Sequence, residues 1–125
     1  MLDVLMERYP WADAHCLSKK GVTRDYKEEW EAYRYLVGGK MFVMLGGDKY
    51  NEPIITVKLE PLFGDTLRRE YKDIIPGHYM NKQHWNSVYL KGDVPDDLLR
   101  SMLDKSYEAV LGGLSKKAQA EILSG

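Results

Sequence analysis

The chain has 125 residues, of which 44% are hydrophobic and 30% charged, and its formal net charge is −1. This length suits one compact domain with its own core, and the composition excludes a chain that is disordered over most of its length. The single cysteine, Cys16, excludes an internal disulfide, and no apolar run approaches the roughly 20 residues of a transmembrane helix. Acidic residues near the start exclude a secretory signal, so we expect a cytoplasmic protein without membrane segments.

The first half of the chain predicts two short helices and then three strands. Apolar residues at helical spacing predict a helix over residues 2–9, and Pro10 kinks it or opens a second helical piece over 11–17. The pair Gly38-Gly39 lies between two apolar runs and predicts a β-hairpin, because glycine readily adopts a positive φ. Turn-forming residues from Gly46 to Asn51 predict a loop. The expected strands, which form an antiparallel meander, cover residues 30–37, 40–45 and 53–59.

The second half predicts a helix, about two strands and a longer helix. Pro61 suits the first turn of a helix whose buried stripe contains Phe63, Leu67 and Tyr71. Its opposite face is expected to be solvated and to carry Asp65, Arg68, Arg69 and Lys72. Residues 74–77 are expected to form a turn. The remaining elements are a strand over residues 84–91, a helix from Pro95 with acidic residues in its first turn, and a final helix over 115–123.

This order of elements predicts an α+β fold, with helices packed on an antiparallel β-sheet. We expect one domain over residues 1–125, with a variable N-terminal helix in residues 1–14 and a fraying C-terminal helix in 115–125. No long apolar patch can be identified on the surface, and a monomer is therefore expected.

The charge is unevenly distributed along the chain. Residues 67–91 carry five basic and two acidic side chains, whereas the rest of the chain is slightly acidic. A basic stretch is compatible with a nucleic-acid contact surface, but a net charge of −1 does not favour binding a polyanion. Charge by itself leaves both interpretations open.

Candidate catalytic and metal-binding groups are sparse. His15, His78 and His84 are not spaced as metal ligands, and Cys16 next to His15 on a helix points about 100° away from it. Cys16 is therefore interpreted as a small core thiol. Paired carboxylates such as Glu28 and Glu29 lie at element starts, where capping or exposure explains them. The sequence predicts no metal site, no cofactor and no catalytic residue.

The most distinctive segment, residues 75–87, is rich in hydrogen-bonding and aromatic side chains. Such residues can contact base edges and phosphates or stack on bases. The structural alternative is a corner in which Asn81 bonds backbone groups, Met80 and Trp85 enter the core, and Lys82 is solvated. That alternative is favoured for Met80 and Trp85. Both interpretations stay open for Lys82, His84 and Asn86.

The run PGHYMNKQHWN at residues 76–86 resembles the signature of the MmcQ/YjbR family, which typically reads P-G-[YH]-[HY]-M-N-K-x-H-W-N. Further motifs of that family are VGGKMF at 37–42, GDVPDD at 92–97, SY at 106–107 and LSKK at 114–117. The resemblance covers roughly residues 15–120. One departure is Leu59, which stands where many members have a cysteine.

The resemblance implies an α-β(3)-α-β(2)-α domain, similar to secretion chaperones and to the frataxin-like fold. Family members are commonly labelled as DNA-binding through a "double wing" of β-hairpins. The positions that this label implies as contacts are Lys40, Lys58, Asn81, Lys82 and His84. Arg34 is added because its strand position is expected near Lys40 across the turn. Four signature residues are assigned either a binding or a structural role: His78, Tyr79, Trp85 and Asn86.

Three classes of function follow. The first is a non-enzymatic protein that binds double-stranded DNA with its hairpins and signature loop. The second is a binding module for an unidentified peptide, protein or small molecule, suggested by the net acidity and the aromatic signature. The third, an enzyme with a site around His78, Tyr79 and His84, has no supporting constellation. A fold shared with other proteins does not decide among them.

Overall fold

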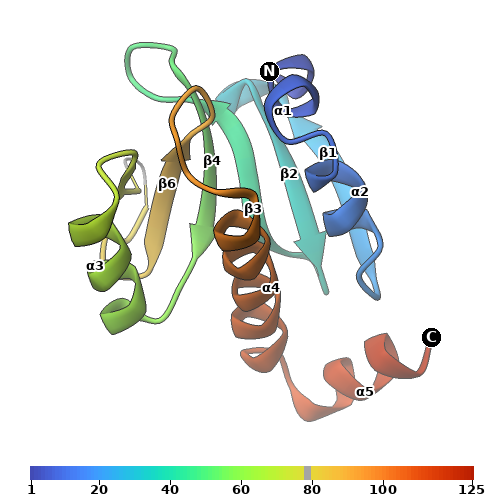
Figure 1. The fold of residues 1–125 in the computed structure, drawn as a ribbon. Helices are drawn as coiled ribbons and strands as arrows, with labels where there is room; N and C mark the ends of the chain where they lie inside the picture. The colour runs from blue at the N-terminus through green and yellow to red at the C-terminus, as the bar shows by residue number, and fades with distance from the viewer. Residues whose placement is uncertain (78–79) are drawn as a thin grey trace.

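A six-stranded antiparallel sheet forms the centre of the computed structural model, which describes residues 1–77 and 80–125 (Figure 1). The strand order is β1-β2-β3-β4-β6-β5. The strands are β1 (Val22–Lys27), β2 (Ala32–Val37), β3 (Lys40–Gly47), β4 (Pro53–Lys58), β5 (Ile74–Pro76) and β6 (Trp85–Tyr89). The helices are α1 (Leu2–Arg8), α2 (Ala12–Leu17), α3 (Pro61–Glu70), α4 (Asp96–Gly112) and α5 (Lys116–Ser124), with a 3-10 turn η1 (Glu28–Trp30). The predicted α+β class is confirmed.

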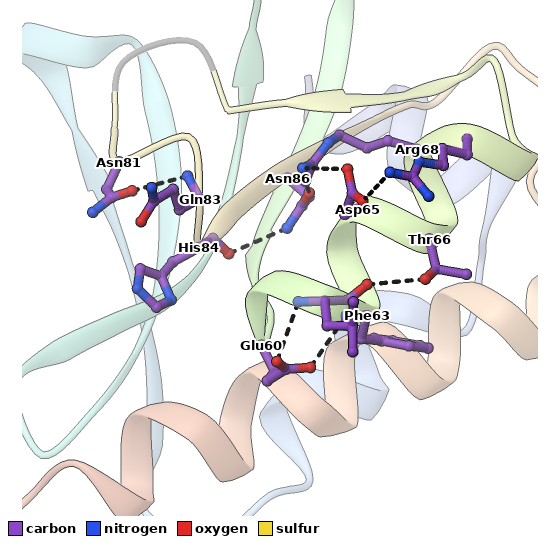
Figure 2. Close-up of polar contacts among 11 residues, drawn as sticks. Glu60, Phe63, Asp65, Thr66, Arg68, Asn81, Gln83, His84 and Asn86 are labelled. Carbon is purple, nitrogen blue, oxygen red and sulfur yellow. Dashed lines mark hydrogen bonds and ion pairs between the residues drawn. The ribbon is translucent and has the colours of Figure 1, made fainter.

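The predicted hairpin at Gly38-Gly39 joins β2 to β3. Both glycines have positive φ, of 58° and 78°. A β-carbon built on Gly38 would lie 2.6 Å from a methyl carbon of Leu114, so Leu114 would have to shift, and the positive φ would strain any other residue there. Helix α3 begins as expected at Pro61, and the Glu60 carboxylate accepts hydrogen bonds from the Leu62 and Phe63 amides at 3.2 and 3.1 Å (Figure 2).

Two strands were not predicted. β1 extends the expected three-strand meander to four, but it is an edge strand with a mostly polar sequence, VTRDYK, and lacks a clear apolar alternation. β5 forms where residues 74–77 were expected to be a turn. Its Pro76 is tolerated because β5 is the other edge of the sheet. The strand expected from residue 30 begins at Ala32, because η1 occupies residues 28–30.

Helices α1 to α4 lie on one face of the sheet, with the core between them and the strands, whereas α5 lies beyond one end of the sheet (Figure 1). Alternate strand residues such as Val43, Val57 and Val88 point into this core, and all three are fully buried. Helix α4 packs over β2, β3 and β4 with a continuous apolar face. The residues that this face contributes to the core are Leu99, Met102, Leu103, Tyr107 and Val110. No helix in the described part of the chain is long and apolar enough to cross a membrane.

Candidate functional site

The opposite face of the sheet, which no helix of the described residues covers, is called the open face here (Figure 1). It is nevertheless buried in its centre, where Met44, Thr56 and Ser87 are only 6%, 1% and 1% exposed. These three residues are cross-strand neighbours on β3, β4 and β6. The hydroxyl groups of Thr56 and Ser87 share a hydrogen bond of 2.7 Å, which satisfies both groups away from solvent.

Residues 77–84, the signature loop, connect β5 to β6. The Gly77 amide donates to the Trp85 carbonyl at 2.8 Å, and the Asn81 carbonyl accepts from the Trp85 amide at 2.9 Å. The Asn81 side chain accepts a further hydrogen bond from the Gln83 amide at 2.9 Å (Figure 2). Asn81 therefore bonds a backbone group in a turn, as the structural alternative expects, and its role as a DNA contact stays a prediction. His78 and Tyr79 lie outside the described residues.

Asn86 lies on the helix-covered face and connects β6 to α3. It is fully buried, its side-chain oxygen accepts a hydrogen bond from Arg68, and its amide nitrogen donates to the His84 carbonyl at 3.2 Å (Figure 2). A β-carbon on Gly64 would lie 2.9 Å from that amide nitrogen, so the glycine leaves the space Asn86 occupies. Arg68 was expected to be solvated. This is wrong, because its side chain is 19% exposed and is directed at Asn86.

Met80 and Trp85 were expected to enter the core, and this expectation is wrong. Both are half-buried, and neither belongs to the core cluster of the described residues. Trp85 pairs with Lys58 across β6 and β4, which places both side chains on the open face. Met80 lines a pocket on that same face.

This open-face pocket has a volume of about 410 Å³ and is formed by three separate segments of chain. The first runs from η1 into β2, the second is the end of β3 with the β3–β4 loop, and the third is the signature loop at Met80. The described lining residues are Glu29, Trp30, Glu31, Ala32, Met44, Gly46, Gly47, Asp48, Asn51 and Met80. Two of them, Glu31 and Asn51, have left-handed backbone conformations with φ of 50° and 63°. Such conformations often cluster at functional sites.

The pocket is acidic. Three of its described lining residues are carboxylates, Glu29, Glu31 and Asp48, and none of the described lining residues is basic. Asp48 is held in place by hydrogen bonds from the Tyr50 and Glu52 amides at 2.8 and 2.9 Å and from the Tyr89 hydroxyl at 3.0 Å. Burial and the bond to Asp48 raise the pKa of Tyr89, so Tyr89 stays a neutral donor.

Trp30 forms one wall of the pocket and is 49% exposed. Two cationic groups of the chain lie near its ring, the Lys27 ammonium at 5.1 Å and the Arg34 guanidinium at 5.8 Å from the ring centroid. Lys27 also forms an ion pair of 3.4 Å with Glu29. The pocket was missed in the sequence because Glu28 and Glu29 were explained by their place at an element start. The run EEWE and the loop GGDKYN are the signals that mark it.

Arg34 is not near Lys40. In the observed register Arg34 pairs with Met44 on β3 and with Asp25 on β1, whereas Lys40 pairs with Val37 at the hairpin tip. The expectation that placed them together overlooked the length of the hairpin. Arg34 instead makes two hydrogen bonds to the Asp25 carboxylate, at 2.8 and 2.5 Å. The hydrogen bond from Arg34 lowers the pKa of Asp25.

The other residues with an implied DNA role are divided between the two faces. Lys40 shares the helix-covered face with its partner Val37, whereas Lys58 is on the open face. Lys82 and His84 follow in the signature loop close to the Lys58 end of β4, where the Leu59 amide donates to the His84 carbonyl at 2.7 Å. Among residues 1–77 and 80–125, Lys58 and Lys82 form no ion pair.

Cys16 and the metal-ligating residue types form no reactive site in the described residues. Burial raises the pKa of the Cys16 thiol to about 12, and the residue is 1% exposed, in agreement with a core thiol. No group of three or more His, Cys, Asp or Glu side chains in the described part of the chain is arranged to hold a metal ion.

Comparisons with known proteins show a matching family, similar relatives and similar solved structures. A family model described as YjbR matches residues 17–109. YjbR of Escherichia coli strain K12, an uncharacterised protein, is 29% identical over 103 residues, which cover 82% of this chain and 86% of that one. YbdF of E. coli O157:H7, also uncharacterised, is 35% identical over 91 residues, or 73% of this chain and 74% of YbdF.

Among solved structures, the Deinococcus radiodurans protein DR2400, assigned to domain family DUF419, is similar with a TM-score of 0.79. It is 28% identical to this chain, and the alignment covers 89% of this chain and 84% of DR2400. A Pseudomonas syringae protein that is 21% identical has a TM-score of 0.61, with coverage of 86% of this chain and 92% of that one. This second similarity supports the fold alone.

Proposed function

The chain belongs to the YjbR family, and from that premise we propose that it is a non-enzymatic binding module whose site is the open-face pocket. The observation that carries the proposal is the pocket itself, because it joins the family signature, through Met80, to two segments distant in sequence. Ligand sites are usually concave, with apolar walls and a few polar groups that fix orientation. Trp30, Met44 and Met80 supply the walls, and the carboxylates supply the polar groups.

The chemistry of the described residues agrees better with binding than with catalysis. A catalytic site requires a nucleophile or a general base within hydrogen-bonding reach of a partner that orients it. Among the described residues the pocket lining contains no histidine, cysteine, serine or lysine. The lining carboxylate that hydrogen bonds orient, Asp48, accepts them from two amides of its own loop and the Tyr89 hydroxyl, which fits a structural role. The hydroxyl pair of Thr56 and Ser87 is buried beneath the open face and both groups are already hydrogen-bonded.

The test is an NMR screen of a small-molecule fragment set containing cations, neutral compounds and anions, with methyl-labelled methionine. Fragments that occupy the pocket are expected to shift the methyl signals of Met44 and Met80 and the indole signal of Trp30. Met6 on α1 and Trp11, the N-cap of α2, serve as internal controls, because α1 and α2 lie across the sheet from the pocket. Fragments that shift only the control signals, or no fragment binding at all, would contradict the proposal.

We propose DNA binding as a second candidate, supported by the position of Lys58, Lys82 and His84 at one end of the sheet. The two lysines form no ion pair with any described residue, so both ammonium groups are available to phosphates. Asn86 is excluded as a direct contact because it is fully buried, and Arg34 is already bound to Asp25.

Fluorescence anisotropy with a labelled duplex, at low and near-physiological salt, tests this candidate. Each phosphate contact is expected to contribute about 0.9 to the slope of log affinity against log salt. Lys82→Ala is expected to lower that slope by about one contact, whereas Lys117→Ala on α5 is expected to leave it unchanged. Absence of binding at low salt, or equal slopes for both variants, would argue against DNA as the ligand.

A further inference from the structure

We propose that the open-face pocket binds a small organic cation, an amine or guanidinium carried on an apolar or aromatic body. This inference rests on the proposed binding function and names the chemical class of its ligand. Three properties of the lining indicate this class of ligand: its charge, its aromatic wall and its apolar floor.

The charge of the lining selects a cation. Glu29, Glu31 and Asp48 come from two separate segments and line one cavity, with no basic residue among its described lining. The Glu31 carboxylate has neither an ion pair nor a hydrogen bond from any residue in 1–77 or 80–125. Like charges gathered at a partly enclosed site repel one another, and a bound cation relieves that repulsion. A phosphate or carboxylate ligand would increase it.

The aromatic wall adds a second interaction specific to cations. Trp30 has the most favourable aromatic ring for a cation–π contact, and nearly half of its surface is exposed. The ring already has Lys27 and Arg34 beside it at distances typical of this contact. Arg34 is held by Asp25, whereas Lys27 has only a 3.4 Å pair with Glu29, an exposed carboxylate. A ligand cation can therefore replace Lys27 at both the ring and the carboxylate.

The floor accommodates the rest of such a molecule. Met44 and Met80 present flexible thioether side chains, which adapt to apolar bodies of different shape, and Ala32 and Gly46 leave room beside them. A pocket of about 410 Å³ is at the lower end of the range for small organic ligands. The ligand is accordingly a single small molecule rather than a folded protein surface.

The experiment compares tyramine with 3-(4-hydroxyphenyl)propionate, which keeps the ring and chain but replaces the ammonium with a carboxylate. Agmatine provides a guanidinium probe. Binding is measured by calorimetry, and the site is identified from the Trp30 and Met80 signals. We expect the two cations to bind and the anion not to bind, with affinity that decreases as salt is added.

Two variants test whether the carboxylates of the lining cause the preference for cations. The double variant Glu29→Gln/Glu31→Gln is expected to weaken tyramine binding about tenfold, since a partly exposed ion pair contributes about threefold to fivefold. Glu28→Gln removes a neighbouring exposed carboxylate outside the lining and is expected to have no effect. Equal tyramine affinity in the double variant would overturn the cation assignment, as would an anion that binds the pocket as well as tyramine. Either result would leave the proposed binding function intact. Failure of all probes and fragments to shift the Trp30 and Met80 signals would contradict both the cation assignment and the proposed binding function.

Discussion

The two faces of the sheet use the same strands for different purposes. On the helix-covered face, Val43, Val57 and Val88 belong to the core cluster and are completely buried. On the open face, the intervening residues Met44, Thr56 and Ser87 are also buried, although no described helix covers them, and Met44 lines a pocket. The open face therefore retains a cavity in which polar groups can meet a ligand.

The signature motif is divided between these faces by the alternation of a β-strand. Asn86 faces α3 and fastens it to the sheet, whereas Trp85 and Ser87 face the open side. Met80, earlier in the motif, reaches the pocket. One continuous run of residues thus serves both the stability of the fold and the proposed site, and mutations can separate the two roles.

The largest expected effect is on the helix-covered side. Asn86→Ala removes two part-buried hydrogen bonds and leaves the Arg68 guanidinium with only its 3.7 Å ion pair to Asp65, so the free energy of unfolding should fall by about 2–4 kcal/mol. Urea denaturation measures the change. Asn81→Ala is the matched control, because Asn81 is exposed and its side chain makes one turn hydrogen bond; it should cost about 1 kcal/mol or less. Equal losses would remove the distinction between the two asparagines.

A smaller effect is expected beneath the open face. Thr56→Val leaves the buried Ser87 hydroxyl without its partner and should lower the free energy of unfolding by about 1–3 kcal/mol. Adding Ser87→Ala removes the unpaired hydroxyl, so the double variant should recover part of that loss. The same denaturation experiment measures both. Additive losses would show that the two hydroxyls are not coupled and that water satisfies each of them.

Ion pairs on the two faces should differ in their response to acid. Asp104 on α4 is partly desolvated, which raises its pKa, but hydrogen bonds from Lys19 at 2.5 Å and His15 at 2.7 Å outweigh this and leave the pKa below 3.8. Because the folded-state pKa is lowered, this stabilisation is present above the unfolded-state value and is lost as pH falls through the folded-state value. Asp104→Asn should therefore reduce the loss of stability between pH 6 and about pH 3, by about 1 kcal/mol or less, since the pair is 40% exposed.

Asp25 provides the open-face counterpart, because the hydrogen bond from Arg34 also lowers its pKa. Asp25→Asn should change the acid response in the same direction and by less, since Arg34 is the one described side chain that donates hydrogen bonds to Asp25, whereas Lys19 and His15 both bond Asp104. Thermal unfolding followed by circular dichroism over the same pH range compares the two variants. A greater effect of Asp25→Asn would show that the open-face pair contributes more to the fold than its exposure indicates.

The smallest effect on stability is expected at the pocket itself. Glu29→Gln/Glu31→Gln changes exposed side chains whose removal leaves no buried group unpaired, so the free energy of unfolding should remain within about 0.5 kcal/mol of the original. A clear stabilisation would show that the carboxylates repel one another in the free protein, which would further support a bound cation as their partner. A loss above about 1 kcal/mol would assign them to the fold instead.

The sequence by itself determined the fold class, the Gly38-Gly39 hairpin, most helices and the family. These features depend on local patterns: apolar spacing of 3.6 or 2 residues, glycines at positive φ, and a contiguous motif. It did not reveal β1 or β5, because edge strands are exposed on one side and do not require regular apolar alternation.

Only the tertiary structure decided which signature residues support the fold and which face the pocket. Asn86 is hydrogen-bonded to Arg68, which is 18 residues away in the sequence. Met80 lines the same pocket as Glu31 and Asp48, which belong to two other segments. Arg34 was misplaced for the same reason, since strand register and not distance along the chain selected Asp25 as its partner. Side chains converge on a site through register and loop path, and both are fixed by packing of the whole sheet rather than by neighbouring residues.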